Sequence, residues 1–245
     1  MTDLFAVTEA TWPAAALHRA GAFVVRQGQG GGKRVSSATL DGPWDARDIA
    51  AAEAMHARLD QPSLFMIRPG EEALDTALAA RGYVVVDPVH IFHARLDVGV
   101  PLCGPVPPVS AFEIWPPLAV MRDIWAEGGI GPERQAVMQR AKGPKTAILA
   151  RSRDRAAGVA FVAIHDGTAM LHALHVLPQL RRQGSAVNIM RKAAHWAQDH
   201  GAGQLSVVVT RANAAACTLY SSLGMQIVAG YHYRLGGTKT GMTAR

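Results

Sequence analysis

A proline-rich segment at residues 98–117 is the feature that most constrains how this chain of 245 residues can fold. The segment holds six prolines, and each proline lacks the backbone N–H group that a helix interior or a central strand requires. We therefore expect a linker at 98–117 between two domains, residues 1–97 and residues 118–245. Both pieces lie within the usual size range of a domain.

The composition indicates a folded protein outside the membrane. Hydrophobic residues make up 49% of the chain and charged residues 18%, which is too apolar for a disordered chain. The longest uninterrupted apolar run, at 159–164, is too short to span a bilayer, as is the mostly apolar run at 205–209. The chain does not start like a signal peptide, and its two cysteines, Cys103 and Cys217, cannot build a disulfide framework. We expect a cytoplasmic protein with no membrane partner.

The net charge of +6 is unevenly distributed along the chain. Residues 1–100 hold 9 Lys and Arg against 12 Asp and Glu, whereas residues 101–245 hold 16 against 7. The second part of the chain therefore carries all of the excess positive charge. Such an imbalance favours an anionic ligand, which could be a phosphorylated cofactor, a nucleic acid or an acidic surface.

The second domain is predicted to alternate helices with strands. The clearest amphipathic helix begins near residue 186 and ends at Gly201, because its apolar residues recur at intervals of three and four. The pattern predicts a mixed α/β fold with a mostly antiparallel central sheet flanked by helices. We expect helices at 118–128, 133–142 and 212–223, strands at 146–151, 158–165, 169–176 and 205–209, and a strand or hairpin at 225–235.

The first domain has a similar but shorter pattern. Its expected elements are strands at 21–26, 34–40 and 63–67, helices at 45–59 and 71–81, and a strand pair at 83–96. An offset of 142 aligns residues 79–83 with 221–225 and places strand 63–67 on strand 205–209. The two domains are therefore predicted to be an internal structural repeat.

The strongest local motif lies at 175–186, where a strand ends and the best helix begins. The first N–H groups of a helix have no partner within the helix, and the helix dipole places partial positive charge there. Gly184 lets an anion approach the backbone, and Ala186 keeps the helix close to the strand. Arg181 and Arg182 add neutralising charge. This turn is predicted to bind a pyrophosphate.

These residues resemble the GNAT superfamily of acetyl-coenzyme A-dependent N-acetyltransferases over about residues 109–235. The resemblance is carried by Val176-x-Pro178, by RRQGSA at 181–186, and by Asn213-x-x-Ala216-x-x-Leu219-Tyr220-x-x-Leu223-Gly224-Met225.

The resemblance implies a cofactor, acetyl-CoA, and a place for it. Strand 169–176 would splay from strand 205–209, and the pantetheine arm would lie in the resulting V. Asn213 would hydrogen-bond that arm, and the Tyr220 hydroxyl would protonate the leaving thiolate. The pyrophosphate would be held by the backbone amides of Gln183, Gly184, Ser185 and Ala186.

The first domain lacks the residues that would bind the pyrophosphate and protonate the thiolate. At the position 142 residues before 181–186 stands TLDGPW, where Asp41 repels phosphate and Pro43 removes an amide donor. The position equivalent to Tyr220 is Leu78, which has no proton to give. We expect residues 1–97 to be a degenerate copy that is kept for structure or for shaping the acceptor site.

The implied reaction is direct attack of a primary amine, on a small molecule, at the thioester carbonyl. The Val176 amide would polarise that carbonyl, and a base would take a proton from the amine. Alternation along an extended strand puts His172 on the face of Val176, which makes His172 the leading base, while His175 is expected to be structural. Spacing of three on a strand places the paired histidines on opposite faces, so no metal is predicted. The other candidate bases are Glu113, Glu127 and Glu133.

Other functions stay open at this point. An acyl-CoA-binding sensor without turnover would share the same motif, and an aminoacyl or other acyl donor could replace acetyl-CoA. No basic tract with interleaved aromatic residues supports nucleic-acid binding. The sequence leaves a homodimer open.

Overall fold

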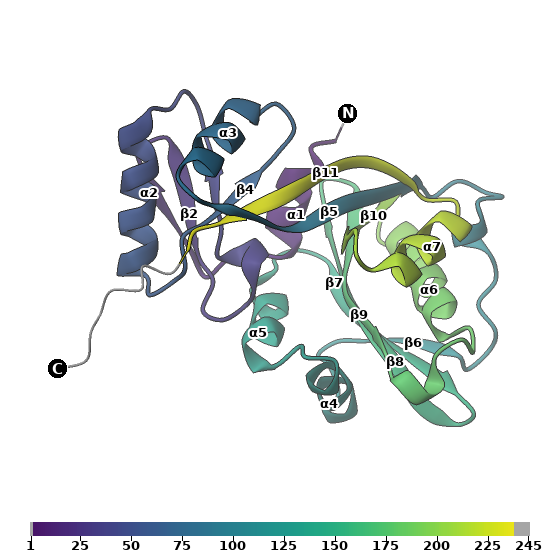
Figure 1. Ribbon diagram of the computed structural model, residues 1–245. Helices are drawn as coiled ribbons and strands as arrows, with labels where there is room; N and C mark the ends of the chain where they lie inside the picture. The colour runs from purple at the N-terminus through teal and green to yellow at the C-terminus, as the bar shows by residue number, and fades with distance from the viewer. Residues whose placement is uncertain (1, 238–245) are drawn as a thin grey trace. The chain divides into compact units, whose positions relative to one another are not determined.

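Figure 1 shows the computed structural model, which describes residues 2–237. The chain forms two compact units. The larger unit comprises residues 2–13 and His90–Ala229, and the smaller unit comprises Ala14–Val89 and residues 230–237. The chain passes between the units within two strands, β5 (Val84–Arg95) and β11 (Gln226–Leu235).

The sheet of the larger unit is mixed and mostly antiparallel. Its strand order is β5-β10-β9-β8-β7-β6. From β6 to β9 each strand pairs antiparallel with the next strand along the chain, and β10 pairs parallel with β9. The meander of three strands expected at 146–176 is confirmed. The strands are β6 (Ala111–Ile114), β7 (Lys145–Ser152), β8 (Arg155–His165), β9 (Thr168–Val176) and β10 (Gln204–Thr210).

Helices pack on both faces of this sheet. Helix α6 buries the apolar stripe predicted for it against one face, next to Ala160 and Val162 of β8. Helices α1 and α4 contact β8 and β9, and the neighbouring β8 residue Phe161 faces this second side because side chains alternate along a strand. The helices are α1 (Leu4–Thr11), α4 (Ala119–Glu127), α5 (Pro132–Arg140), α6 (Ser185–Asp199) and α7 (Ala214–Ser222), with short 3₁₀ turns η2 (Pro101–Cys103) and η3 (Pro178–Leu180).

The prediction that 98–117 is a linker was wrong. The segment contains η2 and the edge strand β6, and Leu102 is fully buried in the core of the larger unit. The Arg191 side chain of α6 donates to the carbonyls of Pro101 and Pro105 at 3.1 Å each. Proline is tolerated here because Pro101 occupies the first turn of η2 and β6 itself contains none.

The smaller unit has its own sheet and core. Strand β2 pairs antiparallel with both β1 and β3. Strand β4 pairs parallel with β3 and antiparallel with β11. Aromatic rings of Phe23, Phe65 and Tyr83 meet edge to face in the core. The elements are β1 (Ala16–Ala20), β2 (Phe23–Gln27), β3 (Ala38–Leu40), β4 (Leu64–Ile67), α2 (Ala46–Arg58) and α3 (Glu72–Ala80), with a 3₁₀ turn η1 (Lys33–Val35).

Three further differences from the sequence-based expectation concern the first 97 residues. Helix α1 and strand β1 were not expected, and α1 belongs to the larger unit. The strand pair expected at 83–96 is one continuous strand, β5, which contains Asp87 at φ +45°. Among the described residues no helix is both long and apolar enough to cross a membrane.

Asp75 of α3 holds the C-terminal half of β11. Its carboxylate accepts from Nε of Arg234 at 2.7 Å and Nη2 at 3.0 Å, and from Nε2 of His232 at 2.7 Å. The hydrogen bonds from Arg234, and further those from His232, lower the pKa of Asp75 to about 2. A depressed folded-state pKa stabilises the fold fully above the unfolded value near pH 4 and loses that contribution as the pH falls toward 2.

We predict that Asp75→Asn lowers the free energy of unfolding by on the order of 1 kcal/mol at pH 7, since solvent screens this partly exposed cluster. Denaturant unfolding of both proteins should show the difference shrinking between pH 4 and pH 2. Asp41→Asn, which removes the well-exposed ion pair to Arg19, is the matched control and should change stability little. A deficit of Asp75→Asn that stays constant down to pH 2 would contradict the assignment.

Candidate functional site

The turn between β9 and α6 presents open backbone donors. Arg182 and Gly184 adopt positive φ values of +61° and +84°, and α6 begins at Ser185. The first bond within the helix runs from the Asn188 N–H to the Gly184 carbonyl at 3.0 Å, so the amides of residues 185–187 point out of the helix end. No side chain caps the helix at Gly184. The predicted strand–turn–helix arrangement is confirmed.

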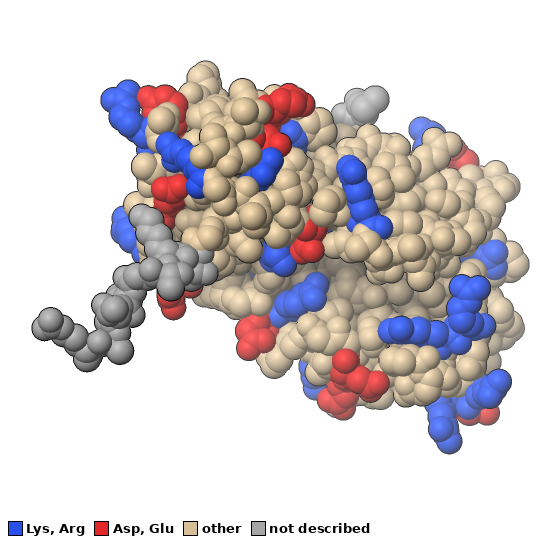
Figure 2. Space-filling view, in the orientation of Figure 1, with Lys and Arg blue, Asp and Glu red and all other residues tan. Residues whose placement is uncertain are grey.

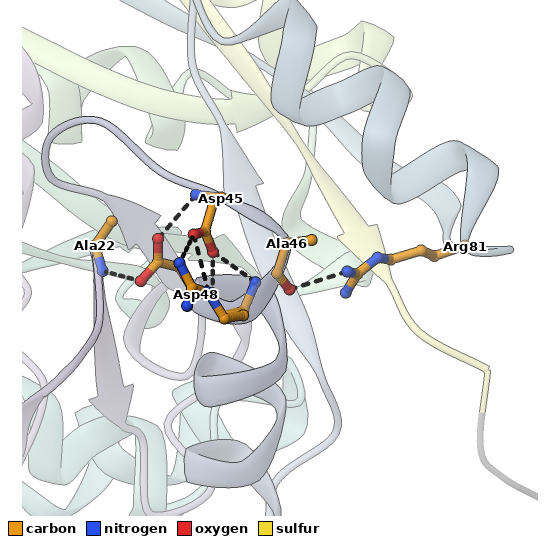
Figure 3. A network of polar contacts seen from close by, with 6 residues as sticks. Ala22, Asp45, Ala46, Asp48 and Arg81 are labelled. Atoms are coloured by element: carbon orange, nitrogen blue, oxygen red, sulfur yellow. Dashed lines mark hydrogen bonds and ion pairs between the residues drawn. The ribbon is translucent and has the colours of Figure 1, made fainter.

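The corresponding helix of the smaller unit has a closed N-terminus, as Figure 3 shows. Asp45 caps α2 by accepting from the N–H groups of Arg47 and Asp48, and the Asp48 carboxylate accepts from the Asp45 N–H at 2.8 Å. Asp48 also accepts from the Ala22 N–H at 3.2 Å. These two carboxylates occupy the donors that an anion would need, and they add negative charge at the same place.

A buried hydroxyl lies at the open end of α6. Ser185 is 2% exposed, and its Oγ has no hydrogen-bond partner among the residues that the structure describes. Such a group carries a desolvation penalty until a ligand or water satisfies it. Two residues earlier, the side-chain amide oxygen of Gln183 accepts from the Ser152 hydroxyl at 2.9 Å, which connects the end of β7 to this loop.

Positive charge surrounds the loop. Figure 2 shows Lys and Arg side chains gathered on the larger unit around β8 and the start of α6. The exposed arginines at the β7–β8 turn are Arg153 and Arg155, and those between β9 and α6 are Arg181 and Arg182. The arrangement favours an anionic group at the helix end.

Strands β9 and β10 separate next to this turn. Their parallel pairing runs from Thr168–Gln204 to Leu171–Val207, although β9 continues to Val176 and β10 to Thr210. The expected splay of the two strands is therefore present.

The backbone of Val176 is directed toward the separated side. The Leu177 N–H donates to the Ala157 carbonyl at 2.9 Å, which makes Leu177–Ala157 a hydrogen-bonded pair and the adjacent Val176–Gly158 a non-hydrogen-bonded pair. The N–H and carbonyl of Val176 thus point away from β8, and the carbonyl accepts from Nε of Arg181 at 3.1 Å. The Val176 N–H lies on the side where β10 no longer pairs.

A β-bulge in β9 changes which side chains share a face. Two β9 residues, Ala173 and Leu174, oppose one β8 residue, and Ala173 has φ +53°. His172 pairs with Phe161 and His175 with Val159, so both histidines face the side of α1 and α4. The expectation that His172 shares a face with Val176 was wrong, because the bulge interrupts the alternation on which it rested.

His172 is enclosed within the larger unit. It is 4% exposed, and its Nε2 lies 2.9 Å from the Thr11 hydroxyl of α1. Its ring packs between Trp12, at 5.0 Å between centroids, and Phe161, at 6.2 Å. This environment explains the residue as a packed, hydrogen-bonded core histidine, and its role as a base stays a prediction.

The two predicted residues of α7 lie at opposite ends of the helix. Asn213 is the N-cap, and its side-chain amide oxygen accepts from the Ala216 N–H at 3.2 Å, so the side-chain NH₂ group takes no part in this cap. Tyr220 is 5% exposed and packs on Phe92 at 5.5 Å between centroids. Burial raises the pKa of Tyr220, so its phenol is protonated at neutral pH.

The three acidic base candidates have different surroundings. Glu113 of β6 forms a 2.7 Å ion pair with Lys192 of α6, on the opposite side of the sheet from α4. Glu133 is exposed in the first turn of α5. Glu127 at the end of α4 lies close enough to His175 to raise the pKa of that imidazole. Within residues 2–237 no three His, Cys, Asp or Glu side chains cluster as metal ligands.

This chain is similar in sequence to known acetyltransferases. Residues 115–225 match the model of the Acetyltransferase (GNAT) family. Over 240 residues the chain is 26% identical to YobR, an uncharacterised N-acetyltransferase of Bacillus subtilis strain 168, and the match covers 92% of this chain and 94% of that protein.

Solved structures share the fold over nearly the whole chain. A GCN5-related N-acetyltransferase from Kribbella flavida superimposes with a TM-score of 0.67 at 19% identity, covering 96% of this chain and 95% of that one. A tandem GNAT protein from the clavulanic acid biosynthesis pathway gives a TM-score of 0.61 at 14% identity, covering 96% and 88%. The predicted fold class is confirmed.

Trp125 of α4 holds the bulge. Its ring is fully buried, and its Nε1 donates to the Ala173 carbonyl at 2.8 Å. We predict that Trp125→Phe lowers the free energy of unfolding by about 1–2 kcal/mol beyond the lost packing, because the carbonyl at the bulge loses its partner. Urea unfolding measures this, with Trp115→Phe as control, since that ring packs on Phe161. Equal losses for the two variants would argue against a role of Trp125 at the bulge.

Proposed function

Because this chain is an N-acetyltransferase whose residues 115–225 form a GNAT-family domain, we propose that it acts in the cytoplasm and transfers an acetyl group from acetyl-CoA to a primary amine on a small molecule. The amine attacks directly while both substrates are bound. The observation that carries the proposal is the uncapped start of α6 beside the splayed strands β9 and β10.

The binding residues follow from their positions. The amides of Gln183, Gly184, Ser185 and Ala186 would hold the pyrophosphate at the positive end of the helix, with Arg181 and Arg182 balancing its charge. Bound acetyl-CoA supplies an activated thioester carbonyl. The amide NH₂ of Asn213 would hold the pantetheine arm between the strands.

Two groups of the chain would act on the reacting atoms. The Val176 N–H, directed to the separated side of β9, would stabilise the negative charge that develops on the thioester oxygen. As the bond from nitrogen to carbon forms, the bond from carbon to sulfur breaks, and the Tyr220 hydroxyl would give its proton to the thiolate. Burial keeps this phenol protonated at neutral pH, so it carries a proton that it could give.

Thiol release from acetyl-CoA across a panel of small primary amines tests the proposal, with cofactor-induced thermal stabilisation measured in parallel. We expect stabilisation, and thiol release that depends on the amine. Stabilisation without turnover on any amine would identify a cofactor sensor instead. Turnover with another acyl-CoA and none with acetyl-CoA would change the donor.

The smaller unit is proposed to be a GNAT-like copy that binds no cofactor, as the tandem GNAT relative and the aligned elements suggest. Asp45 and Asp48 close the start of α2, whereas no side chain caps the start of α6. We predict that isothermal titration calorimetry gives one acetyl-CoA bound per chain. A stoichiometry of two would contradict a degenerate copy.

We predict that Gly184→Asp abolishes acetyl-CoA binding, because it places a carboxylate where the phosphate would lie. Nothing lies within 4 Å of a Cβ built on Gly184, but its positive φ strains any side chain. Gly167→Asp is the matched control, since Gly167 has φ +66°, equal space and a position on the β8–β9 turn. Calorimetry should show binding by the control only. If both variants bind equally well, the pyrophosphate site lies elsewhere.

We predict that Tyr220→Phe lowers kcat by roughly 10²-fold and leaves the affinity for acetyl-CoA nearly unchanged, because only the proton donor is lost. Steady-state kinetics with the best amine, together with calorimetry, separate the two quantities. Full activity of Tyr220→Phe would remove the residue from the mechanism.

A further inference from the structure

We infer that His175, on the face of β9 that packs against α4, is the catalytic base that receives the proton of the acceptor amine. The inference rests on the proposed function and deepens it. It assigns to this residue a role that strand alternation alone would give to His172.

The bulge at Ala173 gives His175 its orientation. Because Ala173 and Leu174 oppose a single β8 residue, His175 returns to the face of Phe161 and Val159, and the next residue is Val176. The side chain of His175 and the N–H of Val176 thus belong to consecutive residues at the end of β9. A nucleophile that approaches from the α4 side would therefore find the imidazole of His175 next to the Val176 N–H that polarises the carbonyl.

The end of α4 is shaped to receive the imidazole. A Cβ built on Gly128 would lie 2.5 Å from Nδ1 of His175 and 2.6 Å from Cγ, distances that real atoms do not reach. Gly128 has φ −80°, which every residue can adopt, so the need for glycine here comes from the ring and not from the backbone. The ring therefore rests directly on the α4 C-cap.

The far nitrogen of this ring lacks a partner. The Nε2 atom of His175 is buried and makes no hydrogen bond to any residue in the described part of the chain. A buried polar atom without a partner is costly, and it is typical of a group that a ligand or substrate satisfies. His172 differs, because its Nε2 is 2.9 Å from the Thr11 hydroxyl.

The charges around His175 suit a base. Burial lowers the pKa of the imidazole and Arg181 lowers it further, while Glu127 raises it. The imidazole is therefore neutral at pH 7 and able to accept a proton. In the reaction the amine loses its proton to the imidazole as the nitrogen–carbon bond forms, and Tyr220 gives its proton to the thiolate as the carbon–sulfur bond breaks.

The first test compares alanine variants of two glycines that lie between α4 and α5. Gly128→Ala pushes the His175 ring away, whereas Gly131→Ala meets only the flexible end of Glu133, at 3.2 Å, and has φ −72°. We expect Gly128→Ala to lower kcat by at least about tenfold, with KM for acetyl-CoA unchanged, and Gly131→Ala to behave as wild type. Equal rates for the two variants would overturn the inference.

The second test uses His175→Gln and Glu127→Gln. We expect His175→Gln to lower kcat by roughly 10²-fold while calorimetry shows unaltered acetyl-CoA binding. In Glu127→Gln the imidazolium loses its stabilising neighbour, so the acidic limb of the kcat/KM profile should move to lower pH. Full activity of His175→Gln, or an unmoved limb in Glu127→Gln, would overturn the assignment.

Failure of the proposed function itself has a separate signature. If wild-type protein binds acetyl-CoA and releases no thiol with any amine of the panel, transfer fails and the base assignment fails with it. If wild-type protein turns over and the His175 and Gly128 variants do as well, only the base assignment fails.

Discussion

The proposed cofactor site depends on a helix, α6, that begins without a side-chain cap. At the start of α6 the chain uses positive φ at Arg182 and Gly184 to turn from β9, and the first amides of the helix face outward. At the start of α2, by contrast, Asp45 and Asp48 satisfy such donors with their carboxylates. Leaving those of α6 open, with the Ser185 hydroxyl buried and unpaired beside them, suits an anionic ligand that completes the site.

The bulge at Ala173 sets the directions of two groups at the end of β9. The backbone of Val176 is turned toward the side where β10 separates, and the side chain of His175 is turned toward α4. Trp125 holds this local geometry by donating to the Ala173 carbonyl. One extra residue in a strand thus sets where a cofactor arm and an acceptor would meet.

The sequence predicts those features that depend on neighbouring residues. The periodicity of α6, the glycine of its first turn and the strands of the second domain are local signals, and the structure confirms them. The bulge at Ala173 depends on pairing with β8, and the burial of Leu102 depends on packing against distant elements. Neither has a signature in a single sequence, so alternation put His172 on the wrong face and proline content suggested a linker.

The amide resonances of the protein during a titration with coenzyme A test the central claim most directly. Two-dimensional ¹⁵N–¹H spectra should show the largest shifts at Gly184, Ser185 and Ala186, and little change at Arg47 and Asp48 in the first turn of α2. The proposed site at α6 is contradicted if coenzyme A binds and the amide resonances at the start of α6 do not shift, or if those of α2 shift most.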